Sequence, residues 1–150
     1  MKFGLSQPMR RVEDPRLLRG SGLYADDLAL PGQTYGVVVR SPHANARIRA
    51  IDTAAAKAVA GVLAVFTGAD FAAAGLGPVP CAIPLRNRDG TPRAALAVDR
   101  VRYVGDPVAF VVAETPKAAK DGAEAVLVDY EPLPAVTDLA AANQPGAPLV

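Results

Sequence analysis

Short runs of β-branched and apolar residues, separated by stretches rich in alanine or in glycine and proline, constrain the fold of this chain more than any other feature. Runs of this kind are typical of β-strands. Five of them occur, at Gln33–Arg40, Ala46–Asp52, Gly61–Thr67, Val108–Ala113 and Val126–Tyr130. None approaches the roughly 20 apolar residues that span a bilayer. The pattern predicts strands with helices between them, which is a mixed α/β domain.

Three of the runs also indicate how the strands are buried. Val108–Ala113 (VAFVVA) is the strongest strand signal, and Gly61–Thr67 is expected to be a buried strand as well. In Ala46–Asp52, Ile48 and Ala50 alternate with arginines. This alternation predicts a half-exposed strand whose inward face carries Ile48 and Ala50.

An alanine-rich segment predicts the first helix of the folded domain. It covers Thr53–Ala60, with Asp52 or Thr53 as the N-cap residue. Gly61 follows, in the position where a helix often ends in a left-handed glycine.

Two further helices are expected to begin at capping residues. Thr67 and Asp70 have the spacing of a capping box, which predicts a short helix through Ala74. Thr115–Pro116 opens the other helix, because proline in the first helical position gives up no hydrogen bond. Small residues in that helix form a stripe that can lie close to a sheet: Ala119, Gly122, Ala123 and Val126.

The remaining stretches predict the domain organisation. Residues 75–96 are rich in glycine, proline and arginine, which predicts a long irregular excursion. Excursions of this length are often functional or interfacial. We expect residues 1–20 to form an N-terminal arm, residues 21–138 the folded domain, and residues 139–150 a linker.

Composition and charge narrow the class of protein. With 150 residues, 51% of them hydrophobic, the chain can form one domain with a conventional core, which excludes disorder. The single cysteine, Cys81, excludes a disulfide scaffold. The net charge of +1 argues against general nucleic-acid binding, and the N-terminal residues lack the apolar segment of a signal peptide. We therefore expect a cytoplasmic protein.

The charge is distributed unevenly along the chain. Residues 1–50 carry eight basic and four acidic groups, whereas residues 101–150 carry three basic and seven acidic groups. The basic arm is expected to bind an acidic partner or to fold back on the acidic C-terminal third. Its basic residues are Arg10, Arg11, Arg16 and Arg19.

Few residues could support chemistry. His43 and Cys81 are the only histidine and cysteine, and their surroundings resemble no nucleophile motif, so a small Cys–His hydrolase is the weakest hypothesis. His43 has no metal-ligating neighbour within four residues. Asp26 and Asp27 are adjacent, which suits a turn or a helix cap better than acid–base catalysis. The residues themselves thus assign no catalytic, cofactor-binding or metal site.

One segment matches a nucleotide-binding pattern without its context. Gly20–Ala25 (GSGLYA) fits the glycine-rich dinucleotide fingerprint, which requires a preceding strand and an acidic residue about 20 positions on. A charged arm precedes it, and Arg40 occupies the acidic position. We therefore do not assign nucleotide binding.

Three stretches taken together resemble a known family. They are Arg11–Asp27 (RVEDPRLLRGSGLYADD), Arg40–Ile48 (RSPHANARI), and Arg102–Ala109 (RYVGDPVA) with Val128–Val136 (VDYEPLPAV). In this order they are similar to the N-terminal α/β-hammerhead domain of the molybdopterin-binding large subunit of the xanthine dehydrogenase/aldehyde oxidase family, on its carbon monoxide dehydrogenase-like branch. The resemblance extends over residues 8–138.

The resemblance implies part of an oxidoreductase. Members of the family hydroxylate aldehydes, N-heterocycles or carbon monoxide at a molybdopterin cofactor with oxygen taken from water. Their electrons leave through [2Fe–2S] clusters on a small subunit to FAD on a medium subunit. The cofactor-binding loops and the general base lie outside the matched region, so the resemblance implies a structural and assembly domain. A free-standing interaction module with the same fold is the alternative.

Within the motifs, individual residues have expected roles. Many relatives have a second histidine where this chain has Asn45, which puts a proton or metal role there in doubt. We expect Ser41–His43 to form a strand-end corner, with His43 hydrogen-bonded to the backbone, or else to line a substrate funnel. We expect Gly105–Pro107 to form a tight turn in which Asp106 accepts backbone hydrogen bonds.

The resemblance also predicts exposed surface. The arm is expected to dock on the iron–sulfur subunit or on later domains of the large subunit, or to cap the sheet. The isolated chain should then self-associate through apolar residues that other domains would cover. These residues are Val12, Leu17, Leu18, Ile83, Leu85, Leu149 and Val150.

Overall fold

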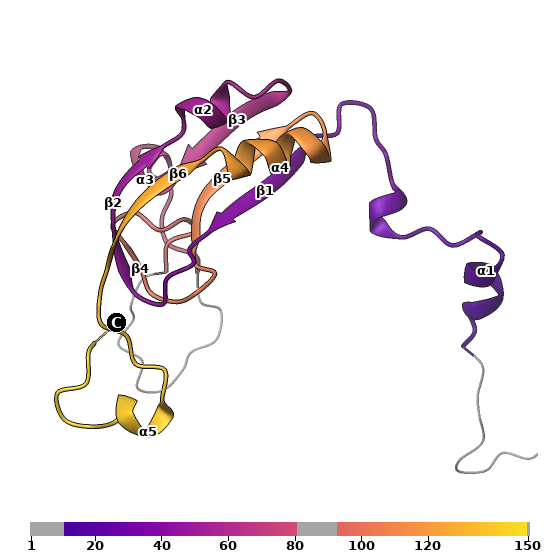
Figure 1. Cartoon of the computed structure of the whole chain (residues 1–150). Coiled ribbons are helices and arrows are strands. Elements are labelled where there is room, and N and C mark those ends of the chain that lie inside the picture. Colours follow the sequence, from indigo (N-terminus) through magenta and orange to yellow (C-terminus); the bar gives the residue numbers. More distant parts are fainter. Residues whose placement is uncertain (1–10, 81–92, 150) are drawn as a thin grey trace, which may run out of the picture. The chain divides into compact units, whose positions relative to one another are not determined.

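The computed structural model describes residues 11–80 and 93–149, and the chain divides into two compact units, Met1–Gln33 and Thr34–Val150. The first unit contains helix α1 (Asp14–Leu18) and the 3-10 helix η1 (Ala25–Asp27) (Figure 1). No residue of either element is buried, so these elements do not build a core.

The second unit contains two three-stranded antiparallel sheets. The first has the order β1-β5-β3, with strands β1 (Tyr35–Arg40), β5 (Pro107–Ala113) and β3 (Val62–Thr67). The second has the order β4-β2-β6, with strands β4 (Arg100–Val101), β2 (Ala46–Asp52) and β6 (Leu127–Pro132). All five predicted strands are present, which confirms the mixed α/β prediction. Strand β4 was not predicted, because two residues carry no periodic signal.

Four α-helices accompany the sheets in the described part of this unit. They are α2 (Ala54–Lys57), α3 (Gly68–Ala73), α4 (Pro116–Glu124) and α5 (Leu139–Ala142). The capping box of α3 and the N-cap of α4 are confirmed: Thr115 Oγ1 accepts a hydrogen bond from the Ala118 N–H at 3.1 Å. Helix α2 is shorter than predicted, since the chain turns at Val59 and then at Gly61, where φ is +86°. No helix among the described residues is both long and apolar enough to cross a membrane.

The core is made of small aliphatic side chains. Helix α4 lies against the first sheet (Figure 1), with its buried face formed by Ala118, Ala119 and Gly122. A Cβ atom on Gly122 would lie 2.8 Å from Val62 Cγ2 and 3.0 Å from Val111 Cγ1. The predicted small-residue stripe is therefore confirmed, and Gly122 is required for the close approach of helix and sheet.

Two burial predictions were wrong, and a register shift lies at each place. In β2 the pairing register shifts between Ile48 and Ala50, which leaves Ala50 exposed and brings Ile51 onto the inward face. In β3 a shift follows Val62, and Leu63 is 54% exposed. A bulge inserts one residue into a strand and so reverses the inward and outward positions beyond it.

The described parts of the 75–96 excursion contain neither helix nor strand, as predicted. Two backbone segments are held together there, since the Val79 N–H donates to the Arg93 C=O at 2.8 Å. Cys81, Ile83 and Leu85 lie outside the described residues.

Candidate functional site

The Ser-Pro-His motif forms a corner where β1 meets β5. Ser41 is 2% exposed; its N–H donates to the Asp106 C=O at 2.9 Å, and its C=O accepts from the Gly105 N–H at 2.8 Å. Gly105 has φ of +90°, a conformation that glycine adopts without strain. Asp106 Oδ2 accepts a hydrogen bond from the Arg102 N–H at 3.0 Å, which confirms the predicted turn.

His43 contributes packing to this corner. Its ring lies edge-on to Tyr130 of β6, with 4.9 Å between ring centroids and 61° between planes. Among the hydrogen bonds of the described residues, none joins the imidazole to the backbone; at this corner the backbone N–H of His43 donates to the Ser41 hydroxyl at 3.0 Å. Burial raises the pKa of the Tyr130 hydroxyl, against an opposing effect from Ser41. The histidine therefore joins the corner to the second sheet.

Asn45 is the buried polar centre of the region. Its side-chain Nδ2 donates to the Pro134 C=O at 2.6 Å, and its Oδ1 accepts from Arg100 Nε at 2.8 Å. Both ends of the amide are thus used in hydrogen bonds within the domain. The sequence analysis singled out Asn45 but could not identify these partners, which are 89 and 55 residues away along the chain.

The other sequence candidates have structural roles. Asp27 Oδ2 accepts from the Tyr24 N–H at 2.9 Å, so it caps η1 as expected for this acidic pair. A helix, α1, precedes Gly20–Ala25 and a 3-10 helix follows it, which is not the strand–turn–helix context of a dinucleotide site.

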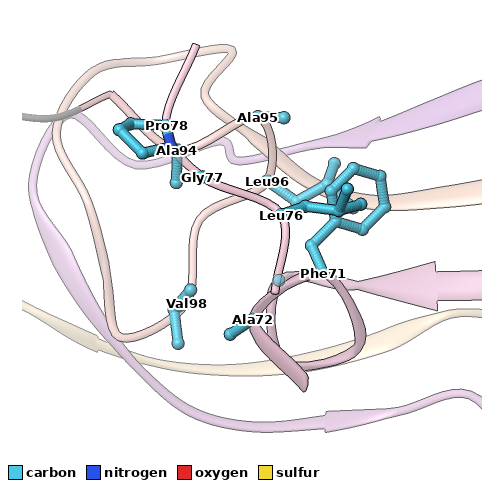
Figure 2. A pocket seen from close by; sticks show the side chains of 10 residues that line it. Phe71, Ala72, Leu76, Gly77, Pro78, Ala94, Ala95, Leu96 and Val98 are labelled. Carbon is cyan, nitrogen blue, oxygen red and sulfur yellow. The ribbon is translucent and has the colours of Figure 1, made fainter. Parts of the chain in front are cut away.

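An apolar hollow of about 210 Å³ lies beside α3 (Figure 2). It is bounded by α3 and by the described flanks of the excursion. The described residues that line it carry no polar side chain; they are Gly68, Phe71, Ala72, Leu76, Gly77, Pro78, Ala94, Ala95, Leu96 and Val98. Such a surface suits contact with another apolar surface better than it suits an anionic ligand.

A second apolar surface is the face of sheet β1-β5-β3 that α4 does not cover. Cross-strand pairs place one set of residues on this face: Gly36, Val38, Ala64, Phe66, Phe110 and Val112. The Phe110 ring lies across Gly36, where an added Cβ would clash with it. Phe66 is 40% exposed at the edge of the face. We call these six residues the outer face. It was not predicted, because the sequence of a strand shows that both of its faces are apolar but not which of them α4 covers.

The described residues do not fit a molybdenum cofactor. They contain no group of three histidine, cysteine, aspartate or glutamate side chains able to hold a metal ion. The lining of the hollow beside α3, as far as the structure describes it, supplies no side-chain donors for a pterin or phosphate group. What the domain offers instead is apolar surface and a tightly hydrogen-bonded corner.

Comparison with known proteins gives the class of this domain. Residues 19–134 match the family model described as "Aldehyde oxidase and xanthine dehydrogenase, a/b hammerhead domain". The chain belongs to this family, and the predicted resemblance is confirmed.

Two relatives within this family show how similar the chain is to known enzyme subunits and how much of them it covers. The chain is 45% identical over 147 residues to the carbon monoxide dehydrogenase large chain of Afipia carboxidovorans, covering 98% of this chain and 17% of that protein. It is 35% identical over 128 residues to the xanthine dehydrogenase molybdenum-binding subunit of Escherichia coli O157:H7, covering 85% of this chain and 17% of that one. The chain thus spans about a sixth of the length of these curated relatives.

Solved structures agree with the sequence comparison. Reconstituted CO dehydrogenase from Oligotropha carboxidovorans superposes with a TM-score of 0.80 at 45% identity, over 97% of this chain and 17% of that one. Quinoline 2-oxidoreductase from Pseudomonas putida 86 gives a TM-score of 0.78 at 42% identity, over 89% and 17%. The hammerhead architecture predicted from the motifs is therefore confirmed.

Proposed function

We propose that this chain is the structural and assembly domain of a molybdenum hydroxylase large subunit, whose complete enzyme hydroxylates its substrate with oxygen taken from water. The observation that carries the proposal is the 45% identity to a carbon monoxide dehydrogenase large chain across 98% of this chain. The molybdopterin cofactor binds elsewhere in the complete enzyme, because the described residues here supply no donor set for it.

The complete enzyme has two further subunits in this proposal, one with [2Fe–2S] clusters and one with FAD, and works in the cytoplasm. Exposed side chains in Met1–Gln33 suit a docking role. Val12 is 95% exposed and Leu18 87%, and arginines lie beside both. Charged groups of this kind steer association more than they hold the complex together.

The outer face is the surface on which the cofactor-bearing part of the large subunit packs. About five sixths of each curated relative lies beyond the matched region, and that part must contact the hammerhead domain somewhere. Helix α4 already covers the other face of the sheet. An apolar face with Phe66 and Phe110 is the kind of surface that a permanent interface buries.

Complementation tests the proposal. The chain is co-expressed with a large subunit from which the matching residues have been deleted, together with its iron–sulfur and FAD subunits. We expect molybdenum retention and dye reduction only when the chain is present. Phe66→Glu should abolish complementation, and Lys120→Glu, on exposed α4 surface, should not.

Three results would contradict this function. Molybdenum bound by the chain alone would place the cofactor here. If the chain stayed monomeric and bound none of the partner subunits, the free-standing interaction module would be favoured. Loss of a hydrolytic activity in Cys81→Ala would instead favour the Cys–His hydrolase.

A further inference from the structure

The segment that follows β6 returns to the second sheet (Figure 1). At its start, the Leu133 N–H donates to the Asn45 C=O at 2.9 Å. At its end, the Leu149 C=O accepts a hydrogen bond from Arg100 Nη2, also at 2.9 Å. The residues that hold its two ends therefore come from neighbouring strands of one sheet, since Asn45 immediately precedes β2 and Arg100 lies in β4.

Asn45 and Arg100 are bonded to each other as well. Asn45 donates to the Pro134 C=O through Nδ2 and accepts from Arg100 Nε through Oδ1. Arg100 uses a second nitrogen for Leu149. A planar guanidinium has donors on three nitrogens in a fixed arrangement, so it can bond both groups together, whereas the single ammonium of lysine cannot reproduce that geometry.

Apolar burial does not explain why the segment lies where it does. Helix α5, in the middle of the segment, has no buried residue, and Leu139 is 92% exposed. By contrast, Asn45 is 4% exposed. The two bonds of the Asn45 amide are partly buried, so water competes with them less. The bond from Arg100 to Leu149 is exposed, but its donor is charged, which makes it stronger than a neutral one.

We propose that Asn45 and Arg100 form a clasp that closes residues 134–149 into a loop and fixes where Leu149 lies on the second sheet. The clasp deepens the proposed function, on which its biological role rests: in a large subunit it would set the point from which the chain departs toward the cofactor-bearing part. Asn45 holds the start of the loop at Pro134, Arg100 holds its end at Leu149, and the bond between Asn45 and Arg100 ties the two anchors together. The entropic cost of closing a loop grows only slowly with its length.

Paramagnetic relaxation measures the clasp directly in the 150-residue chain. A nitroxide label is attached at Gln144→Cys in a Cys81→Ser background, and broadening of the amides of residues 99–101 is recorded by NMR. We expect strong broadening in this reference and a severalfold loss of it in Arg100→Lys. The matched control is Arg47→Lys, an exposed residue directly across from Arg100 on β2, which should keep the broadening.

A second variant separates the clasp from a general effect on folding. A chain ending at Pro148 lacks the Leu149 acceptor but keeps every side chain of the sheets, and it should lose the broadening as Arg100→Lys does. In both variants the order parameters of residues 139–147 should fall from about 0.85 to below about 0.6. Amide shifts of β1, β5 and β3 should stay unchanged.

Two outcomes would overturn the clasp. One is absence of broadening in the reference, and the other is equal broadening in Arg100→Lys, the Pro148 chain and Arg47→Lys. Neither outcome bears on the proposed function, because the measurement involves no cofactor, activity or partner subunit.

Discussion

Replacing Gly68 with alanine should force the start of α3 away from the Leu96–Ala97 backbone, beside the apolar hollow. Gly68 is buried at the start of α3, and a Cβ atom there would lie 2.5 Å from the Ala97 carbonyl oxygen and 2.9 Å from that of Leu96. Ordinary contact for such an atom begins at 3.4 Å, so the segments must separate by about 0.9 Å, the difference between that distance and the shorter contact. The opposing atoms belong to the backbone, which cannot rotate away as a side chain can.

The loss of stability in Gly68→Ala depends on the hydrogen bond that holds the Leu96–Ala97 segment. The Ala97 N–H donates to the Pro107 C=O at 2.7 Å, and a shift of that size takes the bond beyond the usual range. Overpacking costs about 1–3 kcal/mol, and a lost hydrogen bond costs about 0.5–1.5 kcal/mol. Alanine gains up to about 1 kcal/mol over glycine as a helix former. The free energy of unfolding should therefore fall by roughly 1–3 kcal/mol.

Urea unfolding followed by circular dichroism measures this loss. The control is Gly77→Ala, which also lines the hollow but has nothing within 4 Å of an added Cβ. It should change the free energy of unfolding by less than about 0.5 kcal/mol. Equal stability of the two variants would show that the segments beside α3 are not in the described contact.

Three further predictions concern capping, pH and association. Thr115→Ala should lower the unfolding free energy by about 1 kcal/mol in urea titrations, because it removes the N-cap of α4, whereas Thr53→Ala removes no such bond. Hydrogen bonds from the Thr67 hydroxyl and then its N–H lower the pKa of Asp70 below its usual 3.8. The stabilisation by the Asp70 carboxylate is then complete above pH 3.8 and is lost as the pH falls through the folded-state pKa. The difference in urea midpoint between wild type and Asp70→Asn should therefore shrink toward low pH. A difference that does not depend on pH would contradict this. In sedimentation velocity the chain alone should self-associate, more slowly at raised salt. Phe66→Glu should reduce this self-association, and Lys120→Glu should not. If deletion of residues 1–20 abolished it instead, the arm would be the surface through which the chains associate.

Local sequence signals predicted most of the helices and strands, but β-bulges made some predictions of residue burial wrong. Thr67, Asp70 and Thr115 cap their helices as expected, because capping depends on residues three positions apart. Ala50 and Leu63 were expected to be buried but are exposed at register shifts, and such a shift arises from pairing with another strand, which the residues of one strand alone do not show.

For the candidate site, the sequence predicted which motifs matter but not which residues they contact. The sequence singled out Asn45 and Gly105–Pro107 through their resemblance to a family, and the turn preference of aspartate correctly predicted the role of Asp106. The partners of Asn45, the contact of His43 with Tyr130, and the outer face all depend on segments that are distant along the chain. Such contacts follow from topology, which periodicity does not specify.

The edge-on contact of His43 with Tyr130 gives this domain a built-in spectroscopic reporter. The chain has one histidine, so an isotope label confined to histidine gives a single set of imidazole C–H resonances. With ring centroids 4.9 Å apart, the ring current of Tyr130 must displace those resonances from their free-imidazole positions. Selective labelling of this one histidine would therefore report the integrity of the strand-end corner, even inside an assembly too large for full assignment.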